Sequence, residues 1–306
     1  MTTALLTHPA CLGHDAGPWH PERPDRLRAV LAALEGEAFA PLLREPAPEA
    51  TVEQLALAHP RGYVEAILAI RPPEGETVAL DADTAMNVGS VPAALRAAGA
   101  AVAAVDAVMD GWARNAFAAI RPPGHHAEPA RPMGFCLFNN AAIAALRARA
   151  RWGLRRVAVV DFDVHHGNGT QAMFAPDADL FYGSSHQMPC YPGTGAVAET
   201  GVAGNIVNAP LRPGAGGDAF REAWAERILP ALAAFAPELL VISAGFDAHR
   251  DDPLAELRLE TADFAWITEE LIGVAGGRVV SVLEGGYDLD ALAAAAAAHV
   301  RVLMGA

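Results

Sequence analysis

Four segments in which an apolar run ends directly in polar or ionisable residues constrain the fold most strongly. VAVV runs into DFDVHHGNG, LLVIS into AGFDAHRDD, VVSVL into EGGYD, and AFAAI precedes RPPGHH. Continuous apolar runs are typical of strands in a parallel sheet that helices cover on both faces. Ligands bind beyond the carboxyl ends of the strands in such sheets. The four segments therefore predict one polar site at one edge of the sheet.

Short apolar runs alternate with longer helical patterns along the chain, which predicts βαβ units and a mostly parallel sheet. The expected strands are Ala116–Ile120, Val157–Asp161, Leu180–Gly183, Leu239–Ser243 and Val279–Leu283. The expected helices are Val91–Met109, Asn140–Ala150, Ala219–Phe235, Ala262–Ala275 and Leu289–Met304. We expect Pro41–Ala50 and Arg71–Glu76 to be surface loops. Because no repeat or Ser/Gly linker divides the chain, residues 1–306 are expected to form one domain.

The composition excludes several classes of protein and partner. A net charge of −14 disfavours nucleic acid as a partner and favours cationic molecules such as lysine-rich peptides or polyamines, although acidity that only maintains solubility stays an alternative. Three cysteines without CxxC spacing fit a reducing compartment, and we expect a cytoplasmic protein. We see no signal peptide and expect no membrane span, because no apolar run of about 18 residues lacks a charge, histidine or proline.

The DFDVH segment has the spacing of a metal site. Asp161, Asp163 and His165 alternate, so on an extended backbone their side chains point to the same side. A carboxylate and an imidazole are good ligands for Zn²⁺ or a similar ion, and Asp247, at the end of another strand, is the natural third ligand. Three protein ligands leave positions open for water and substrate, as in catalytic sites. Residues of these types also cap helices and cross-link loops, which is the alternative interpretation.

Two further motifs carry groups suited to catalysis. His125 and His126 follow a turn stiffened by two prolines and a glycine in RPPGHH. Neighbouring imidazoles disfavour double protonation, which separates their pKa values and suits them to different roles. Tyr287 follows a double glycine, and a phenol beside a metal can donate a hydrogen bond to a developing oxyanion. The alternatives are an incidental histidine pair on a loop and a buried tyrosine with a satisfied hydroxyl.

The motifs together resemble a known family. RPPGHHAE, GFCLFNN, DFDVHHGNGTQ, SAGFDAHRDDPL and LEGGYDLD closely resemble the zinc-dependent histone deacetylase superfamily, which includes acetylpolyamine amidohydrolases. HPERPDRL near the N-terminus is also similar, so the resemblance spans essentially the whole chain. It implies a single-domain, three-layer α/β/α fold of the arginase and deacetylase type, with a mostly parallel central sheet.

The resemblance also implies a role for each motif residue. His126 resembles the general base that activates water and then protonates the leaving amine, and His125 its electrostatic partner. Tyr287 resembles the group that polarises the amide carbonyl. Asp161 is expected to pair with His125, and Asn168 with His126. Asn at this position resembles the class II branch and should leave His126 less basic than a carboxylate partner would. The implied zinc ligands are Asp163, His165 and Asp247.

The substrate channel and a second ion are implied in the same way. Gly134, Phe135 and Tyr191 match the walls of a narrow channel that grips an acyl-lysine stem, with Tyr191 where most relatives carry Phe. Thr84, or its neighbour Asp83, is expected to hold the substrate backbone at the rim. The implied potassium site consists of Asp161, Asp163, His165 and Ser184.

Three functions stay open at this point. The first is a deacylase acting on N-acyl-lysine in proteins or peptides, and the second an acetylpolyamine amidohydrolase. Polyamine-selective class II relatives carry glutamate where this chain has Leu254, which favours acyl-lysine, although polyamine enzymes can also select through a dimer. The third is an acyl-binding module without catalysis, which we disfavour because no motif residue is missing. The residues do not separate Zn²⁺ from Fe²⁺ and leave a homo-oligomer possible. His59, His186, His249 and His299 are expected to be structural or solvated.

Overall fold

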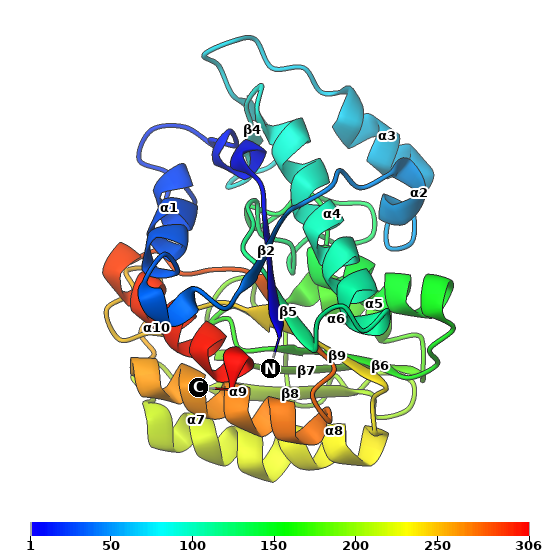
Figure 1. The fold of residues 1–306 in the computed structure, drawn as a ribbon, viewed down its shortest axis with the longest axis vertical. Coiled ribbons are helices and arrows are strands. Elements are labelled where there is room, and N and C mark those ends of the chain that lie inside the picture. The colour runs from blue at the N-terminus through cyan, green and yellow to red at the C-terminus, as the bar shows by residue number, and fades with distance from the viewer. Residues whose placement is uncertain (1, 306) are drawn as a thin grey trace.

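An eight-stranded sheet runs through the middle of the computed structural model, which describes residues 2–305 (Figure 1). The strand order is β2-β1-β5-β10-β9-β6-β7-β8, and every neighbouring pair is parallel. The strands are β1 (Thr3–Thr7), β2 (Leu43–Pro46), β5 (Asn115–Ala118), β6 (Val157–Asp161), β7 (Leu180–Gln187), β8 (Ile206–Leu211), β9 (Leu239–Ala244) and β10 (Val279–Leu283). The short strands β3 (Val78–Ala79) and β4 (Ala85–Met86) form a separate antiparallel pair.

Helices cover both faces of the sheet, which gives the three layers that the sequence resemblance implies (Figure 1). One layer contains α4 (Ser90–Met109), α5 (Asn140–Trp152) and α6 (Asn168–Phe174). The other contains α1 (Pro24–Ala33), α7 (Gly217–Ala223), the π-helical turn η3 (Trp224–Ile228), α8 (Leu229–Phe235), α9 (Thr261–Val274) and α10 (Leu289–Met304). The shorter helices are η1 (Pro9–Leu12), η2 (Glu37–Phe39), α2 (Val52–Leu55) and α3 (Arg61–Ala69).

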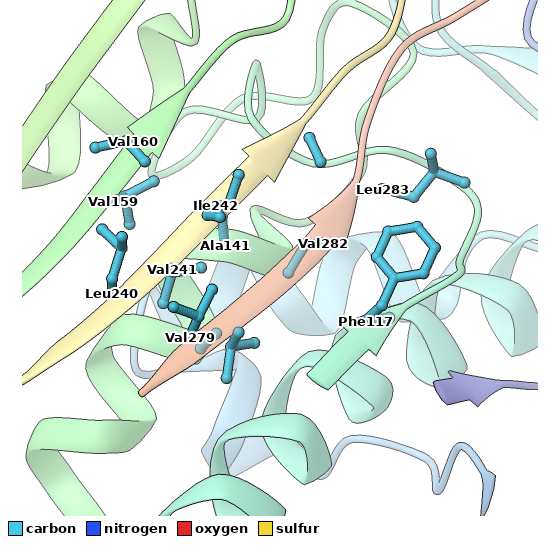
Figure 2. Close-up of a cluster of buried hydrophobic side chains, with 14 of the residues drawn as sticks. Phe117, Ala141, Val159, Val160, Leu240, Val241, Ile242, Val279, Val282 and Leu283 are labelled. Atoms are coloured by element: carbon cyan, nitrogen blue, oxygen red, sulfur yellow. The ribbon is translucent and has the colours of Figure 1, made fainter. Parts of the chain in front are cut away.

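The central strands β6, β9 and β10 are buried along their whole length. Figure 2 shows Val159, Val241 and Val282 on these strands among the apolar side chains that fill the space between sheet and helices. Successive side chains of a strand point to opposite faces, and both faces here meet a helical layer. The sequences of these strands are therefore continuous apolar runs. Each strand ends where its buried apolar run gives way to a polar loop.

The parallel sheet and the central elements that the sequence predicts are confirmed, with shifts of a few residues at their ends. The one helix expected over Ala219–Phe235 is divided into α7, the π-helical turn η3 and α8. The strand expected over Leu180–Gly183 continues to Gln187, because its polar end pairs with β8. The expectation that Pro41–Ala50 is only a loop is wrong. Leu43 pairs with Ala4, so β2 is an edge strand of the sheet, and its last residue, Pro46, is tolerated there because an edge strand leaves one side unpaired.

Among residues 2–305, α4 is the one helix long and apolar enough to cross a membrane by length and composition. Most of its apolar stretch is buried inside the protein. It packs on α5 and on strands β1 and β5, as core helices do.

Candidate active site

The four polar segments lie together because their strands are neighbours. Strands β5, β10, β9 and β6 are adjacent in the sheet and parallel, so the loops that follow them leave at the same edge. RPPGHH follows β5, EGGYD follows β10, AGFDAHRDD follows β9, and DFDVHH ends β6. The predicted convergence at one sheet edge is therefore what the fold produces.

Asp163, His165 and Asp247 present one ligand atom each within 4.8 Å of one another. The Nδ1 atom of His165 lies 3.2 Å from Oδ1 of Asp163 and 3.1 Å from Oδ2 of Asp247. All three side chains are buried. The backbone fixes the cluster, since the amides of His165 and Val164 donate to the carboxylates of Asp163 and Asp247. The sequence predicted this triad, and the fold brings it together.

The donor set suits a divalent cation. Burial and the nearby Asp163 carboxylate raise the pKa of Asp247 to about 7, because a second buried negative charge beside Asp163 is unfavourable. A cation between them would offset both penalties, and two carboxylates with one imidazole are ligands that Zn²⁺ or Fe²⁺ accepts. Gly285 makes room for the cluster, because a Cβ atom there would lie 2.2 Å from Oδ2 of Asp247.

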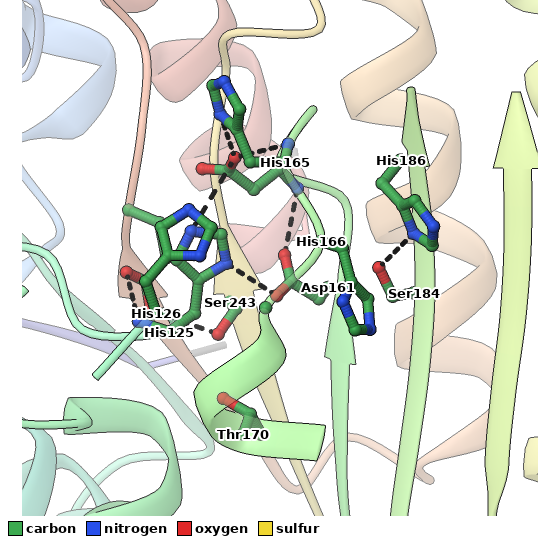
Figure 3. Close-up of polar contacts among 12 residues, drawn as sticks. His125, His126, Asp161, His165, His166, Thr170, Ser184, His186 and Ser243 are labelled. Atoms are coloured by element: carbon green, nitrogen blue, oxygen red, sulfur yellow. Dashed lines mark hydrogen bonds and ion pairs between the residues drawn. The ribbon is translucent and has the colours of Figure 1, made fainter. Parts of the chain in front are cut away.

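His125 is held as a charged imidazolium. Its ring is directed at Asp161 (Figure 3), and Nδ1 lies 2.9 Å from Oδ2 of that carboxylate. Burial lowers the pKa of His125, but the carboxylates of Asp161 and Asp163 outweigh burial and raise it to about 10. The other oxygen of Asp161 accepts from the amide of Asp163, and Tyr182 donates to the oxygen that His125 uses. Asp161 therefore links the histidine to the metal-ligand loop.

His126 is held neutral, with a defined tautomer. Its Nδ1 atom lies 2.8 Å from Oδ1 of Asn168, while the amide nitrogen of Asn168 donates to Glu128. An amide oxygen only accepts, so Nδ1 of His126 carries the proton and Nε2 keeps a free lone pair. Burial, followed by the neighbouring charge of His125, lowers the pKa of His126 well below its ordinary value. The two rings lie 4.0 Å apart and so differ in protonation, as the sequence predicted for this pair.

Tyr287 lies across the cavity from the histidine pair, in the loop between β10 and α10. The guanidinium of Arg26 stacks on its ring at 4.8 Å and donates to the backbone carbonyls of Glu284 and Gly286. Burial raises the pKa of Tyr287 well above its ordinary value, so the phenol stays a hydrogen-bond donor. Arg26 is itself fully buried and paired with Glu22.

A cavity of about 230 Å³ opens onto these groups. Phe135 and Tyr191 form aromatic walls, since the Phe135 ring lies 6.0 Å from Tyr287 and the Tyr191 ring 5.0 Å from His126. Gly134 is required where the wall meets the histidine pair, because its φ is +57° and a Cβ atom would lie 2.4 Å from the His126 ring. The complete lining is Asp83, Pro123, His125, His126, Gly134, Phe135, His165, Tyr191, Leu254, Gly285 and Tyr287.

Thr84 lies behind the cavity wall. It is 2% exposed, and its hydroxyl donates to Asp83 and accepts from the amide of Phe135. Asp83 also accepts from the amide of Gly134 and is the member of the pair that lines the cavity. The two residues thus support the turn that carries Phe135, a contact that the sequence did not predict.

Ser184 lies beside the metal-ligand loop. It pairs in register with Asp161 across β6 and β7. Its hydroxyl lies 2.9 Å from Nδ1 of His186, a contact drawn as a dashed line in Figure 3. The four residues expected at a potassium site, Asp161, Asp163, His165 and Ser184, are all buried in this region.

Glu284 is a site residue to which the sequence analysis gave no role. Its fully buried carboxylate accepts from the amides of Gly124 and His125 and from the hydroxyl of Ser243. It therefore fixes the histidine turn to β9 and β10. Burial raises its pKa to about 7. The signal was its place in EGGYD, directly after a buried strand, but its partners depend on the tertiary fold.

Comparison with known proteins gives consistent results. Residues 20–303 match the family described as histone deacetylase domain. Among curated relatives, the chain is 40% identical to a "Histone deacetylase-like amidohydrolase" of Pseudomonas aeruginosa, over 93% of this chain and 81% of that protein. It is 40% identical to "Histone deacetylase 14, chloroplastic" of Arabidopsis thaliana, over 97% of this chain and 75% of that one. The solved structure of the HDA15 HD domain aligns with a TM-score of 0.93 at 39% identity, over 99% of this chain and 88% of that one.

Proposed function

This chain belongs to the histone deacetylase family, and we propose that it is a zinc-dependent amidohydrolase that removes acetyl or other acyl groups from N-acyl-lysine in peptides or proteins. One observation carries the proposal. The differently protonated histidine pair, Tyr287 and the ligand cluster, through its member His165, line one aromatic-walled cavity. An amide bond hydrolysed by direct attack of water needs a base, an electrophile for the carbonyl and a proton donor for the leaving amine.

The protein's own groups supply the proton transfers. Nε2 of His126 has the free lone pair that takes a proton from the attacking water, and the same nitrogen then returns it to the leaving amine. The positive charge of His125 stabilises negative charge that develops nearby, and Asp161 holds that charge in place. The neutral Tyr287 hydroxyl donates to the carbonyl oxygen as it becomes an oxyanion.

Zn²⁺ held by Asp163, His165 and Asp247 would supply a Lewis acid for the carbonyl oxygen and would lower the pKa of the attacking water. The same ligand set accepts Fe²⁺, which is the alternative metal in the cell. Potassium is proposed as a structural ion beside Asp161 and Ser184, which are neighbours on β6 and β7.

The shape of the cavity and its rim favour acyl-lysine as substrate. Phe135 and Tyr191 offer flat faces to an alkyl stem, and the rim residue Leu254 is apolar and 38% exposed. An acetylpolyamine carries at least one free ammonium group that would favour a carboxylate at such a position, and the Leu254 side chain offers none. Acetylpolyamine hydrolysis is the second candidate, because the net charge of −14 also attracts polyamines. We propose a reducing compartment such as the cytoplasm, since Cys11, Cys136 and Cys190 are unpaired.

A turnover panel tests the proposal. Purified protein is assayed on acetyl-lysine peptides, longer acyl-lysine peptides, acetylputrescine and acetylspermidine, with and without a chelator. We expect the highest kcat/KM on an acyl-lysine peptide, loss of turnover with chelator, and recovery on adding Zn²⁺ or Fe²⁺. A preference for acetylpolyamines of about tenfold, or roughly 1.4 kcal/mol of transition-state discrimination, would reverse the substrate assignment. Binding of acyl-lysine without turnover in any metal would instead indicate a binding module.

A further inference from the structure

Asp252 lies behind the cavity, between two of the loops that form it. Its side chain is 7% exposed, and each carboxylate oxygen has a different partner. Oδ1 accepts from the amide of Leu254 at 3.0 Å, and Oδ2 accepts from the amide of Tyr287 at 2.7 Å. We propose that Asp252 is a positioning residue that fixes the Tyr287 hydroxyl and the Leu254 rim relative to each other through one carboxylate. This inference rests on the proposed deacylase function of the same site.

The Tyr287 loop needs such an anchor because neither a strand nor a helix holds it. Strand β10 ends at Leu283, and α10 begins at Leu289. Between them, Gly286 has a φ of +125°, a conformation in which glycine is the favoured residue and which gives the loop little intrinsic stiffness. Arg26 donates to the carbonyls of Glu284 and Gly286, and Asp252 accepts from the Tyr287 amide. The position of the phenol therefore depends on two buried charged groups.

The other carboxylate oxygen of Asp252, Oδ1, contacts the channel rim. Leu254 lines the cavity, and its amide is fixed by the same carboxylate within a tight turn around Pro253. A carboxylate can accept at both oxygens, whereas an amide side chain has one accepting oxygen and one donating nitrogen. An asparagine here would direct an N–H group either at the amide of Leu254 or at the amides of Tyr287 and Asp288, the latter 3.4 Å from Oδ2. The structure therefore requires Asp rather than Asn at this position.

The adjacent Asp251 provides a matched control. Its side chain is 64% exposed, and its carboxylate approaches His249 at 3.5 Å. Asp251→Asn and Asp252→Asn make the same chemical change one residue apart. They differ in whether the carboxylate contacts the Tyr287 and Leu254 amides.

The kinetic test uses both variants in two backgrounds. On an acyl-lysine peptide, we expect Asp252→Asn to lower kcat on the order of tenfold with full metal content and a smaller change in KM, because a displaced phenol weakens a transition-state contact. Asp251→Asn should match the unsubstituted protein. In a Tyr287→Phe background, Asp252→Asn should change kcat less than about twofold, since residues that act through one group are not additive. Equal, additive losses in both backgrounds would show a general structural effect and overturn the proposal.

The hydrogen bond between Asp252 and the Leu254 amide is tested separately, by the preference of the enzyme for one acyl chain over another. The ratio of kcat/KM for acetyl-lysine to that for a longer acyl-lysine should shift in Asp252→Asn and stay constant in Asp251→Asn. A variant that loses kcat with an unchanged ratio would overturn the coupling of rim and tyrosine.

Hydrogen exchange in the unsubstituted protein keeps the test independent of how the variants fold. The amides of Tyr287 and Leu254 both lie in loops, where exchange is usually fast. Their hydrogen bonds to Asp252 should protect both amides from exchange. Exchange at the rate of an unprotected loop would overturn the proposal. If the unsubstituted protein turns over no substrate of the panel, the proposed function fails. If it turns over substrate but Asp252→Asn behaves as Asp251→Asn does, only this inference fails.

Discussion

At the scale of single residues, the surroundings of His125 and His126 give two adjacent imidazoles opposite protonation states. His125 contacts a carboxylate, which stabilises its positive charge, and its pKa lies near 10. His126 contacts an amide oxygen, which fixes the proton on Nδ1 without stabilising a second one. The neighbouring charge of His125 disfavours a further proton on His126. The chemical difference between Asp161 and Asn168 thus assigns the base.

Substitution of the proposed base tests this assignment. We expect His126→Ala to lower kcat by about 10²–10⁴-fold, the usual contribution of a proton-transfer residue. Metal content should stay at the level of the unsubstituted protein, because His126 is not one of the three clustered donors. The measurement is steady-state turnover on an acyl-lysine peptide together with metal analysis. Near-full turnover with metal bound would show that another group is the base.

Removal of the Tyr287 hydroxyl tests the electrophile. Tyr287→Phe keeps the ring that stacks on Arg26 and deletes the donor, so we expect kcat to fall about 10²–10³-fold, as for loss of one oxyanion donor, with KM little changed. Tyr63→Phe is the control, because its hydroxyl donates to the carbonyl of Leu137 and it does not line the cavity. A rise in KM at constant kcat would instead mean that Tyr287 only binds the substrate.

At the scale of elements, two neighbouring segments hold the aromatic channel wall. Gly134 and Phe135 both have positive φ, of +57° and +69°, and such a conformation is unfavourable for phenylalanine. The amides of this turn donate to Asp83 and Thr84 in the loop between β3 and β4. These two bonds stabilise a turn that the residues of the turn would not favour alone.

Thr84→Val tests whether the β3–β4 loop supports the wall. Valine keeps the shape of threonine but leaves the partly buried Phe135 amide without its acceptor, and such a loss costs at most about 1–3 kcal/mol, the value for a fully buried N–H group. We expect KM for an acyl-lysine peptide to rise several-fold with kcat much less affected, because the wall binds the stem and does not contact the carbonyl. Thr77→Val is the control, since Thr77 is exposed in the same region. Equal KM values for the two variants would show that Thr84 does not support the channel wall.

The difference between local sequence signals and tertiary contacts explains which parts of the structure the sequence could predict. Strands β6, β9 and β10 are buried on both faces, so their continuous apolar runs identified them. Strand β2, with exposed residues at the sheet edge, has no such run. The metal donors could be predicted because alternation in DFDVH and the strand ends are local signals. The roles of Thr84, Asp252 and Glu284 could not, because their partners lie in other loops that only the tertiary fold brings near.

At the scale of the whole molecule, His299 joins a helical layer to the sheet. It lies in α10, and its ring contacts Thr268 of α9 through Nδ1 at 2.6 Å and Ser281 of β10 through Nε2 at 2.8 Å. The hydroxyl of Thr268 donates to the carbonyl of Phe264, so it accepts from Nδ1, and Nε2 of His299 accepts from Ser281. Both ring nitrogens are used in the neutral form, and the side chain is fully buried.

This arrangement makes acid stability depend on His299. Burial lowers the pKa of the imidazole to about 3, against an ordinary value of 6.5 in the unfolded chain. Between these pH values the unfolded state binds the proton and the folded state does not. The contribution of the neutral, buried His299 to the free energy of unfolding is therefore full above about pH 6.5 and is lost as the pH falls towards 3. Each pH unit in this window should remove up to about 1.4 kcal/mol of unfolding free energy through this one group.

His299→Gln keeps polar atoms at this position but cannot titrate. We measure the free energy of unfolding by denaturant titration between about pH 4 and pH 6. We expect its slope against pH to be smaller than in the unsubstituted protein, by an amount that corresponds to up to one proton bound on unfolding. Thr268→Val removes one partner of the ring without removing its titration, so it should lower the curve while keeping most of its slope. Identical slopes for His299→Gln and the unsubstituted protein would mean that other buried histidines, such as His14 and His59 with pKa values lowered to about 4, account for the acid sensitivity.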